Sequence, residues 1–333
     1  MVEPGRVAES LGGPGFDLVE RAASAIDRYD MLTPGPVVVA VSGGPDSMCL
    51  FDVIARLSSR YSTQPVVAHV DHALSEDSER IAARVGHFAA QGGYDAHVAK
   101  APDLAGSNLH ARARDFRYEF FGIVAQQVGA QRIATGHTLD DRVETTIARL
   151  IHGAGTRGLA GLPPVENARI RPLIAVRRSE TASYCDERGI DYWVDPANDD
   201  PRFERARVRN EVVSAIESGW GQGAVEAIAR SAELLRDDAL LLETLATSVH
   251  KELAREHEEG VSFPAARLIE LPRALKRRVL ERAVGEVRDR SGGIEAAVDA
   301  LDGKARPGAR FAVATGMEIV VGADEVTVSR MPQ

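Results

Sequence analysis

Residues 37–51 read VVVAVSGGPDSMCLF, an apolar run followed by a glycine-rich loop and a second apolar stretch. The apolar run predicts a buried strand, and the residues from about Met48 onward have helical spacing. Gly43 and Gly44 let the backbone approach a ligand closely, and N–H groups at the start of a helix attract anions. A Walker loop needs a Lys before its Ser or Thr, and a dinucleotide-binding loop needs three spaced glycines, so this loop is neither. The stretch therefore predicts a phosphate loop of another kind; the alternative is a turn that only joins strand to helix.

The same strand–helix unit recurs along the chain. Strands are predicted at 37–41, 65–70, 94–98 and 132–134, each followed by a helix, at 48–57, 75–91, 109–128 and 139–151. A helix over 16–29 precedes the first strand, and another is predicted around 179–188. This alternation is typical of an α/β fold in which a doubly wound parallel sheet is covered on both faces. Ligands of such sheets bind beyond the carboxyl ends of the strands.

The length of 333 residues is more than one compact core usually holds, so we expect two domains. We predict a loose leader and lead-in helix at 1–31, a catalytic domain at 32–214, and a smaller, mainly helical domain at 215–333. Alternating apolar residues between 310 and 330 predict two or three short strands at the end of that second domain.

Composition excludes several classes of protein. Hydrophobic residues make up 44% and charged residues 27%, which is ordinary globular usage. The net charge of −9 argues against a wholly basic nucleic-acid-binding surface but allows a local basic path. Two cysteines cannot build a disulfide framework or a four-thiolate zinc site, and they fit a reducing cytoplasm. No signal peptide or apolar stretch of membrane-spanning length is present, so we expect no membrane anchoring.

Two further stretches carry candidate site residues. At the end of the second strand, alternation places His69 and Asp71 on one side, although histidines there are often only packing residues. In the helix at 109–128, Arg114 and Arg117 are three residues apart, a spacing suited to gripping phosphate, and the alternative is a solvated charged face. Both stretches follow strand ends, where the ligand is expected.

The segment GHTLDDRVET, residues 136–145, concentrates acids on a helix face. His137, Asp141 and Glu144 fall within about 60° of one another on a helical projection. Like charges so close cost stability unless a cation or a cationic substrate answers them, and carboxylates suit Mg²⁺ better than zinc. The alternative is a helix N-terminus that carries acids for the helix dipole, and Asp140 fits that alternative.

The loop SGGPDS resembles the pyrophosphate-binding loop of the N-type ATP pyrophosphatases, the PP-loop superfamily with the adenine nucleotide alpha hydrolase-like fold. Four stretches resemble the tRNA(Ile)-lysidine synthetases in order and spacing, over roughly residues 35–211: HVDHALSEDSE, ARARDFRYEFF, GHTLDDRVETTIARLIHGAGTRGLAGLPP, and RPLIAVRRSETASYCDERGIDYWVDPANDD followed by RVRN. GMP and NAD synthetases share the loop but not the GHTLDDRVET segment, and the related thiolating enzymes typically carry paired cysteines.

The resemblance implies a ligase that forms a carbon–nitrogen bond. Its substrates would be ATP, with Mg²⁺, L-lysine, and an isoleucine tRNA with a CAU anticodon, whose wobble cytidine receives the lysine through an adenylated intermediate. The implied ATP-binding residues are Ser42, Gly43, Gly44, Pro45, Asp46, Ser47 and His69. The implied catalytic residues are Asp46, Arg117, His137, Asp141, Glu144 and Arg209, with Asp46 and Asp141 as candidate Mg²⁺ ligands.

Basic clusters suggest where tRNA would bind. The candidates are Arg205 in the Arg-rich stretch at 202–210 and Arg273, Lys276, Arg277 and Arg278 in the second domain. The alternative for the second cluster is a solvated helix laced with opposite charges. A homodimer is compatible with the sequence, which does not fix the oligomeric state.

Two other functions remain open at this point. The chain could be a different PP-loop ATP pyrophosphatase that modifies tRNA or forms an amide, or a non-catalytic nucleotide sensor or RNA-binding module. The chain also departs from the family pattern: many members have a second His in place of Gly136 and an Arg in place of His152, and the family's Arg and Pro after Asn210 are missing.

Overall fold

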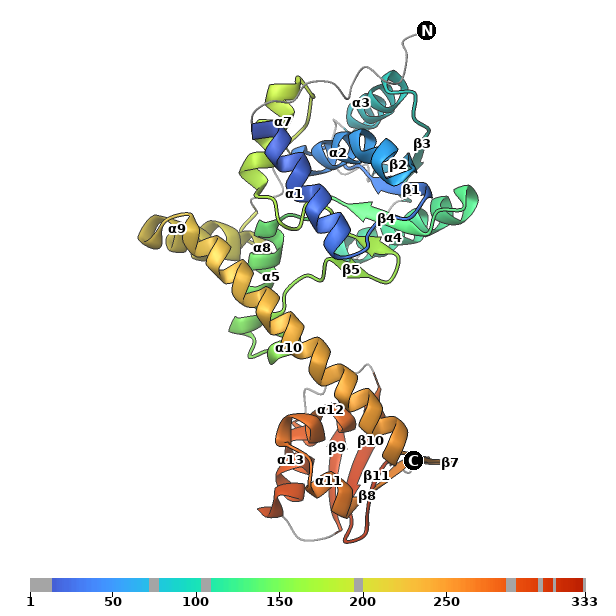
Figure 1. The fold of residues 1–333 in the computed structure, drawn as a ribbon, viewed down its shortest axis with the longest axis vertical. Coiled ribbons are helices and arrows are strands. Elements are labelled where there is room, and N and C mark those ends of the chain that lie inside the picture. Colours follow the sequence, from blue (N-terminus) through green and yellow to red (C-terminus); the bar gives the residue numbers. More distant parts are fainter. Residues whose placement is uncertain are drawn as a thin grey trace. The chain divides into compact units, whose positions relative to one another are not determined.

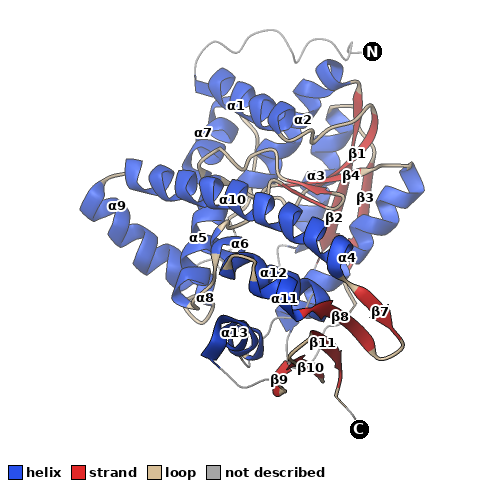
Figure 2. Cartoon of the chain, turned by 60° about the horizontal axis from the view of Figure 1, so that its bottom comes forward, coloured by secondary structure: helices blue, strands red, loops and turns tan. Residues whose placement is uncertain are grey.

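The computed structural model describes residues 14–71, 78–102, 109–194, 200–285, 292–304, 308–313 and 316–331. The chain divides into two compact units, Met1–Glu233 and Leu234–Gln333, each with its own sheet (Figures 1 and 2). Most of the predicted loose leader lies outside the described residues. No helix among the described residues combines the length and the apolar character that crossing a bilayer requires.

Unit 1 is built on a six-stranded sheet in the order β3-β2-β1-β4-β6-β5. All neighbours are parallel except β5, which runs antiparallel to β6 at one edge. The strands are β1 (Gly35–Ala40), β2 (Thr63–Asp71), β3 (Ala96–Lys100), β4 (Arg132–Thr135), β5 (Val165–Glu166) and β6 (Arg169–Ile170). The four predicted strands are therefore present and parallel, and the hairpin of β5 and β6 was not predicted.

Helices cover both faces of this sheet (Figure 1). One face packs against α1 (Pro14–Arg28), α2 (Pro45–Tyr61), α3 (Ser78–Gln91) and α7 (Arg178–Arg188), with Val37, Val39 and Val67 in the shared core. The other face packs against α4 (Leu109–Val128), through Val38, Val66 and Phe121. The three valines of the central β1, Val37, Val38 and Val39, are thus buried against helices on one face or the other, and the predicted doubly wound fold is confirmed.

The order of the strands creates a switch point between β1 and β4. The chain leaves β1 toward α2 and β2 on one side, and it leaves β4 toward α5 (Leu139–Ile151), so two strand-to-helix loops diverge at neighbouring carboxyl ends. They approach closely: a Cβ on Gly136 would lie 3.0 Å from the backbone carbon and oxygen of Asp46. A ligand in this fold is expected at this edge of the sheet.

The rest of unit 1 is helical. It comprises α6 (Thr156–Leu159), α8 (Glu204–Arg207), the π-helical segment η2 (Val208–Val213), α9 (Ser214–Trp220) and the start of α10 (Gly223–Leu253). Val143 and Ile147 of α5 pack with Val208 and Val225, so η2 and α10 are fixed against the helix that follows β4.

Unit 2 contains the end of α10, α11 (Ala265–Ile269), α12 (Arg273–Val284), α13 (Gly293–Asp299) and the π-helical segment η3 (Ala300–Lys304). Its antiparallel sheet has the order β7-β8-β11-β10-β9. The strands are β7 (Arg255–His257), β8 (Gly260–Pro264), β9 (Ala309–Val313), β10 (Met317–Val321) and β11 (Glu325–Arg330). The last three are the predicted terminal strands, whereas β7 and β8 lie in a region predicted to be helical. The domain boundary near residue 215 stays a prediction, because α10 runs without interruption from one compact unit into the other.

Candidate active site

The loop between β1 and α2 is folded around its two serines. The Ser42 N–H donates to Ser47 Oγ at 3.0 Å, and Ser47 Oγ–H donates to the Gly44 carbonyl at 2.9 Å. Gly43 has a φ of +90°, which an L side chain rarely adopts, and its carbonyl accepts the Trp193 N–H at 2.9 Å. Gly44 is the N-cap residue of α2 and offers no side chain to cap its amides. An anion is therefore the natural partner for the first turn of α2.

Asp46 stands in this first turn and is held by α7. Thr181 Oγ1–H donates to Asp46 Oδ1, and Arg178 Nε approaches Asp46 Oδ2 at 3.4 Å. Burial raises the pKa of Asp46 to about 6, against the opposing effect of the Thr181 hydrogen bond and the Arg178 charge. The carboxylate is thus oriented by two side chains from a helix far along the sequence.

The start of α5 fixes the second carboxylate. Thr138 is the N-cap residue, and its N–H and Oγ1–H donate to Asp141 Oδ2 at 2.6 and 3.0 Å. The remaining oxygen, Asp141 Oδ1, accepts from Arg178 at 2.6 Å and also from Arg205. Burial alone would raise the pKa of Asp141, but Arg205 and Arg178 lower it to about 2. Asp141 is therefore ionised at neutral pH.

Glu144 lies one turn further along α5 and is almost inaccessible, with 1% of its side chain exposed. Its carboxylate accepts from Arg178 at 2.9 Å, from Arg205 at 2.8 Å and from Arg209 at 2.7 Å. Burial opposes ionisation, but the hydrogen bond from Arg209 and the charges of Arg178 and Arg205 lower the pKa of Glu144. Three guanidiniums thus surround one buried carboxylate.

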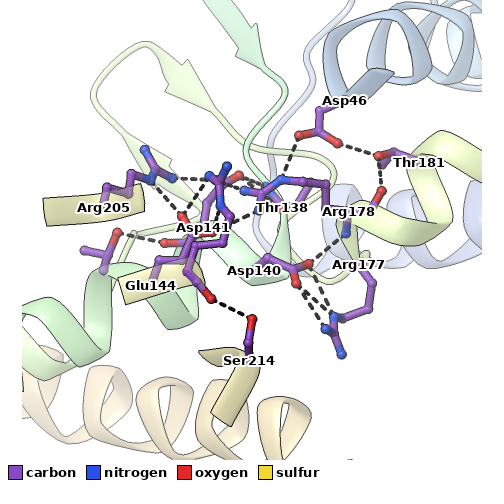
Figure 3. Close-up of polar contacts among 12 residues, drawn as sticks. Asp46, Thr138, Asp140, Asp141, Glu144, Arg177, Arg178, Thr181, Arg205 and Ser214 are labelled. Carbon is purple, nitrogen blue, oxygen red and sulfur yellow. Dashed lines mark hydrogen bonds and ion pairs between the residues drawn. The ribbon is translucent and has the colours of Figure 1, made fainter. Parts of the chain in front are cut away.

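These residues form one cluster, which we call the carboxylate–guanidinium cluster: Asp46, Asp141 and Glu144 with Arg178, Arg205 and Arg209. Figure 3 shows Arg178 between Asp46 and Asp141, with Arg205 on the opposite side of Asp141. The sequence predicted that a cation neutralises the acids of α5, and in the structure arginines of the chain itself pair with them. Arg205 was predicted to contact tRNA; its guanidinium here contacts Asp141 and Glu144, and the tRNA contact stays a prediction.

Arg178 and Thr181 were not identified from the sequence. Arg178 lies 34 residues beyond Glu144, at the start of α7, so helical periodicity could not connect them. The available signal was the Arg177–Arg178 pair just before the helix predicted around 179–188.

Asp140 does more than place a negative charge at a helix start. It accepts the Arg178 backbone N–H at 2.7 Å and the Arg177 Nε–H at 3.2 Å. Arg177 also pairs with Glu217 of α9 and with Glu226 of α10, the latter at 2.9 Å. Two adjacent acids of α5 therefore pair with two adjacent arginines of α7, one pair inside the cluster and one beside it (Figure 3).

The two histidines lie at the same edge of the sheet. His69 Nδ1–H donates to the Val41 carbonyl at 2.7 Å, and burial lowers the pKa of His69. His137 Nδ1 lies 2.9 Å from Thr135 Oγ1, and burial, with nearby arginines, lowers the pKa of His137 to about 4. Both imidazoles are neutral at pH 7. His72, in the same quoted stretch as His69, lies outside the described residues.

Arg117 lies on α4. It is half-buried, burial lowers its pKa, and its charge acts on His69. The structure therefore brings Arg117 near His69.

A magnesium site is only partly prepared by these residues. Among the described residues no three His, Cys, Asp or Glu side chains are arranged to hold a metal ion. The Arg178 guanidinium contacts both Asp46 and Asp141, at 3.4 and 2.6 Å, so the chain itself already places a cation beside these two carboxylates. Mg²⁺ in nucleotide sites often takes one or two carboxylates and completes its shell with phosphate oxygens and water. Both carboxylates have two engaged oxygens, but Asp46 lies in the first turn after the loop and its contact with Arg178 is long, at 3.4 Å, so Asp46 fits that role better than Asp141, which Arg178 approaches at 2.6 Å.

The basic cluster of unit 2 is paired with acids. Arg273 of α12 approaches Glu295, Asp299 and Asp302 at 2.9, 2.8 and 2.7 Å. Lys276, which is buried, lies 2.6 Å from Asp302. Arg277 pairs with Glu295, and Arg278 lies 3.6 Å from Glu243. These contacts match the alternative prediction, a solvated helix whose basic residues form ion pairs with acids. Binding of tRNA by this cluster stays a prediction.

Comparison with known proteins identifies the family of the chain. Residues 19–216 match the PP-loop domain family. A tRNA(Ile)-lysidine synthase of Symbiobacterium thermophilum is 35% identical over 81% of this chain and 59% of its own length. One of Salinispora tropica is 39% identical over 65% of this chain and 66% of its own length. A tRNA(Ile)-lysidine synthase of Nostoc sp. is 35% identical over 75% of this chain and 78% of its own length. The chain thus spans about three fifths to four fifths of the length of these relatives.

A likeness to a solved structure concerns the fold alone. A U34-tRNA thiolase from Methanococcus maripaludis superimposes with a TM-score of 0.55 at 17% identity, over 66% of this chain and 78% of the thiolase. At this identity the likeness shows a common α/β fold.

Proposed function

This chain belongs to the tRNA(Ile)-lysidine synthase family, and from that membership we propose that it ligates L-lysine to the wobble cytidine of an isoleucine tRNA with a CAU anticodon. In the first step the C2 oxygen of the base attacks the α-phosphate of ATP, and pyrophosphate leaves. In the second step the ε-amine of lysine attacks C2, and the C–O bond breaks so that AMP leaves with that oxygen. We propose the cytoplasm as the place of this reaction.

The β1–α2 loop is the pyrophosphate site in this proposal. Departure of pyrophosphate builds negative charge, which the first amides of α2 and the hydroxyl of Ser42 would stabilise. Asp46 is oriented by Thr181 beside the same loop and would hold Mg²⁺. When bound, Mg²⁺ would neutralise phosphate charge. Arg117 would approach the adenylate from α4, on the His69 side.

The carboxylate–guanidinium cluster is the proposed lysine site. Free lysine carries an α-ammonium and a carboxylate, so a site for it needs ionised acids and guanidiniums side by side. Asp141 and Glu144 supply the acids, and Arg178, Arg205 and Arg209 supply the guanidiniums. An entering ammonium would take the place of one guanidinium at the acids, and the released guanidinium would be free for an anionic group of a substrate. This combination of charges beside a phosphate loop is the observation that carries the proposal.

His137 is the proposed acceptor of the amine proton. Lysine must attack as a neutral amine, and an imidazole that is neutral at pH 7 has the form that accepts a proton. Phosphate charge brought beside the ring would raise its pKa and so strengthen it as a base.

The test is a ligation assay. The folded chain, ATP, Mg²⁺ and labelled lysine are incubated with the isoleucine tRNA bearing CAU and, in parallel, with the methionine tRNA that shares this anticodon. The proposal expects label in the first RNA only, together with AMP. No label and no AMP would overturn it, and AMP release that does not depend on lysine would instead favour another ATP pyrophosphatase.

A further inference from the structure

A second group of arginines lies beside the site, where α4 meets the β5–β6 hairpin. The Arg114 guanidinium carbon lies over the Tyr118 ring, 5.0 Å from its centroid. The Arg169 guanidinium carbon, from β6, lies over the same ring at 4.7 Å. Two segments more than fifty residues apart thus bring two guanidiniums to one tyrosine.

The tyrosine holds both guanidiniums in place. Its ring packs edge-on against Phe121 of the core at a centroid distance of 6.2 Å, which fixes the plane of the ring. An arginine stacked on an aromatic face loses little further freedom when its N–H edge binds an anion. The planar fork of the guanidinium matches the geometry of a phosphate group. The arrangement is therefore suited to phosphate.

The local charge is positive. Glu166 lies 3.3 Å from Arg169 and 2.8 Å from Arg171. Arg171 is buried and also donates to the Pro163 carbonyl at 2.6 Å, so it cannot leave Glu166 to meet a ligand. One carboxylate thus faces the guanidiniums of Arg114, Arg169 and Arg171, and positive charge remains in excess. The acids that follow Arg114 and Tyr118 on α4, at 115 and 119, point about 100° further round the helix.

This group begins at the site and leads away from it. Arg114 and Arg171 are both close enough to His137 for their charges to lower its pKa. Arg169 pairs in register with Ile133, further back along β4, so the arginines run from His137 along the α4 face of the sheet edge. A strand of RNA with its reacting base beside His137 would carry its neighbouring phosphates in this direction.

We propose that Arg114 and Arg169, positioned over Tyr118, bind backbone phosphates of the RNA strand next to the base that is modified. The inference rests on the proposed function, because it takes the reacting base of an RNA to lie beside His137. These contacts would position the RNA and carry no sequence information themselves.

The test measures RNA binding without catalysis. The full chain and its variants are titrated with an anticodon stem-loop bearing CAU at several salt concentrations, in the absence of ATP and lysine. Arg114→Ala and Arg169→Ala should each weaken binding several-fold and reduce the salt slope by about 0.7, the value for one phosphate of a single strand. Tyr118→Phe keeps the ring and should bind the stem-loop as tightly as wild type. Tyr118→Leu removes the ring and should weaken binding about as much as either arginine variant.

Arg60→Ala is the matched control. Arg60 is stacked on Tyr61 at 5.4 Å and paired with Asp27, but it lies at the far end of α2, away from the carboxyl ends of the strands. It should leave both affinity and salt slope unchanged. If Arg169→Ala and Arg114→Ala lower the melting temperature yet bind RNA with the wild-type slope, the arginines only fasten α4 to the hairpin and the proposal is wrong.

The outcomes separate this proposal from the proposed function. A wild-type chain that binds the stem-loop through these arginines but never ligates lysine would reject the ligase and keep the phosphate site. If the wild-type chain ligates lysine and both arginine variants bind the stem-loop with unchanged affinity, the ligase proposal stands and the phosphate site is rejected.

Discussion

At the scale of single residues, Arg178 has the largest consequence. Its guanidinium contacts Asp46, Asp141 and Glu144 at 3.4, 2.6 and 2.9 Å, and no other side chain of the cluster reaches all three acids among the described contacts. Arg178→Ala removes one of three guanidiniums from acids that are nearly inaccessible, so we expect a loss of about 2 kcal/mol in the free energy of unfolding. Millimolar L-lysine or guanidinium should restore part of it, because a ligand that binds only the folded state stabilises that state. Melting temperatures with and without each cation measure both effects.

The control for this prediction is Arg202→Ala. Arg202 also forms a close ion pair, with Asp200 at 2.5 Å, but its side chain is 83% exposed and lies outside the cluster. It should change the melting temperature little and show no recovery with added cation. Equal responses of the two variants would contradict a cation site at the cluster.

The pKa of His137 predicts a pH dependence of stability. Its folded value of about 4 lies below the ordinary 6.5, chiefly because the ring is buried. The unfolded chain therefore binds a proton more readily, and the stability that the neutral ring contributes is present above pH 6.5 and lost as the pH falls to about 4. The glutamine of His137→Gln does not titrate, so the stability of this variant relative to wild type should rise as the pH falls from 6.5 to about 4. Melting curves of metal-free protein between pH 4 and 7 test this, and an imidazole seen by NMR to titrate near its ordinary value would contradict it.

Sequence reasoning at this scale succeeded where the contacts are local. His137, Asp141 and Glu144 were predicted to lie on one helix face from spacing alone; in the structure Asp141 and Glu144 share arginines, whereas His137 precedes the N-cap residue Thr138 and lies outside the helix. The residues that sequence reasoning missed, Arg178 and Thr181, meet Asp46 only because α7 packs on α2. No periodicity encodes that meeting, since it depends on how the sheet is covered.

At the scale of elements, α5 and α7 are joined at their N-termini by two neighbouring ion pairs. Asp140 pairs with Arg177, and Asp141 pairs with Arg178 inside the cluster. Arg177 lies outside the cluster and also pairs with acids of α9 and α10. We expect Asp140→Ala to cost about 2 kcal/mol in folding, a fall of several degrees in melting temperature, because α7 loses a cap and Arg177 loses a partner. Turnover of the folded variant should stay within about threefold of wild type.

The adjacent Asp141 provides the contrast. Asp141→Asn should lower kcat/KM on the order of 100-fold, because its carboxylate holds two guanidiniums and the proposed lysine site. Melting temperatures and lysidine formation measured on both variants separate the two roles. Comparable losses of turnover in Asp140→Ala and Asp141→Asn would contradict the division between a joining pair and a site pair.

Element prediction was accurate where the periodic pattern was long. The bounds of α4 and α5 equal the predicted ones, and β1, β2 and β4 contain the predicted strands nearly whole. Strands β5 and β6 are two residues each and too short to show a period. The β7–β8 hairpin was missed because it lies between strongly helical stretches, and β7 is exposed and polar.

At the scale of the whole molecule, the net charge of −9 is compatible with a confined basic path. In the cluster three guanidiniums balance three carboxylates, so the local excess of positive charge comes from the arginines around Tyr118. In unit 2 the basic residues of α12 pair with acids of α13, of η3 and of α10. Among the described residues, the arginines around Tyr118 therefore offer positive charge to the proposed RNA beside the candidate site, and such a confined basic path would limit indiscriminate binding.

The two compact units have separate hydrophobic cores, and this predicts how the chain unfolds. Unit 2 buries Phe263, Leu280 and Ile319 in a core of its own, and α10 contributes Val225 to unit 1 and Leu253 to unit 2. Because each unit has a hydrophobic core of its own, we expect calorimetry to resolve two transitions. ATP binds at the β1–α2 loop in our proposal, so at about 100 times its Kd it should stabilise unit 1 by about 2.7 kcal/mol and move only one transition. Phe263→Ala, which empties a buried site in unit 2, should lower the other transition and leave the shift with ATP unchanged. A single transition that moves as a whole, with ATP or with the variant, would show that the two cores unfold together.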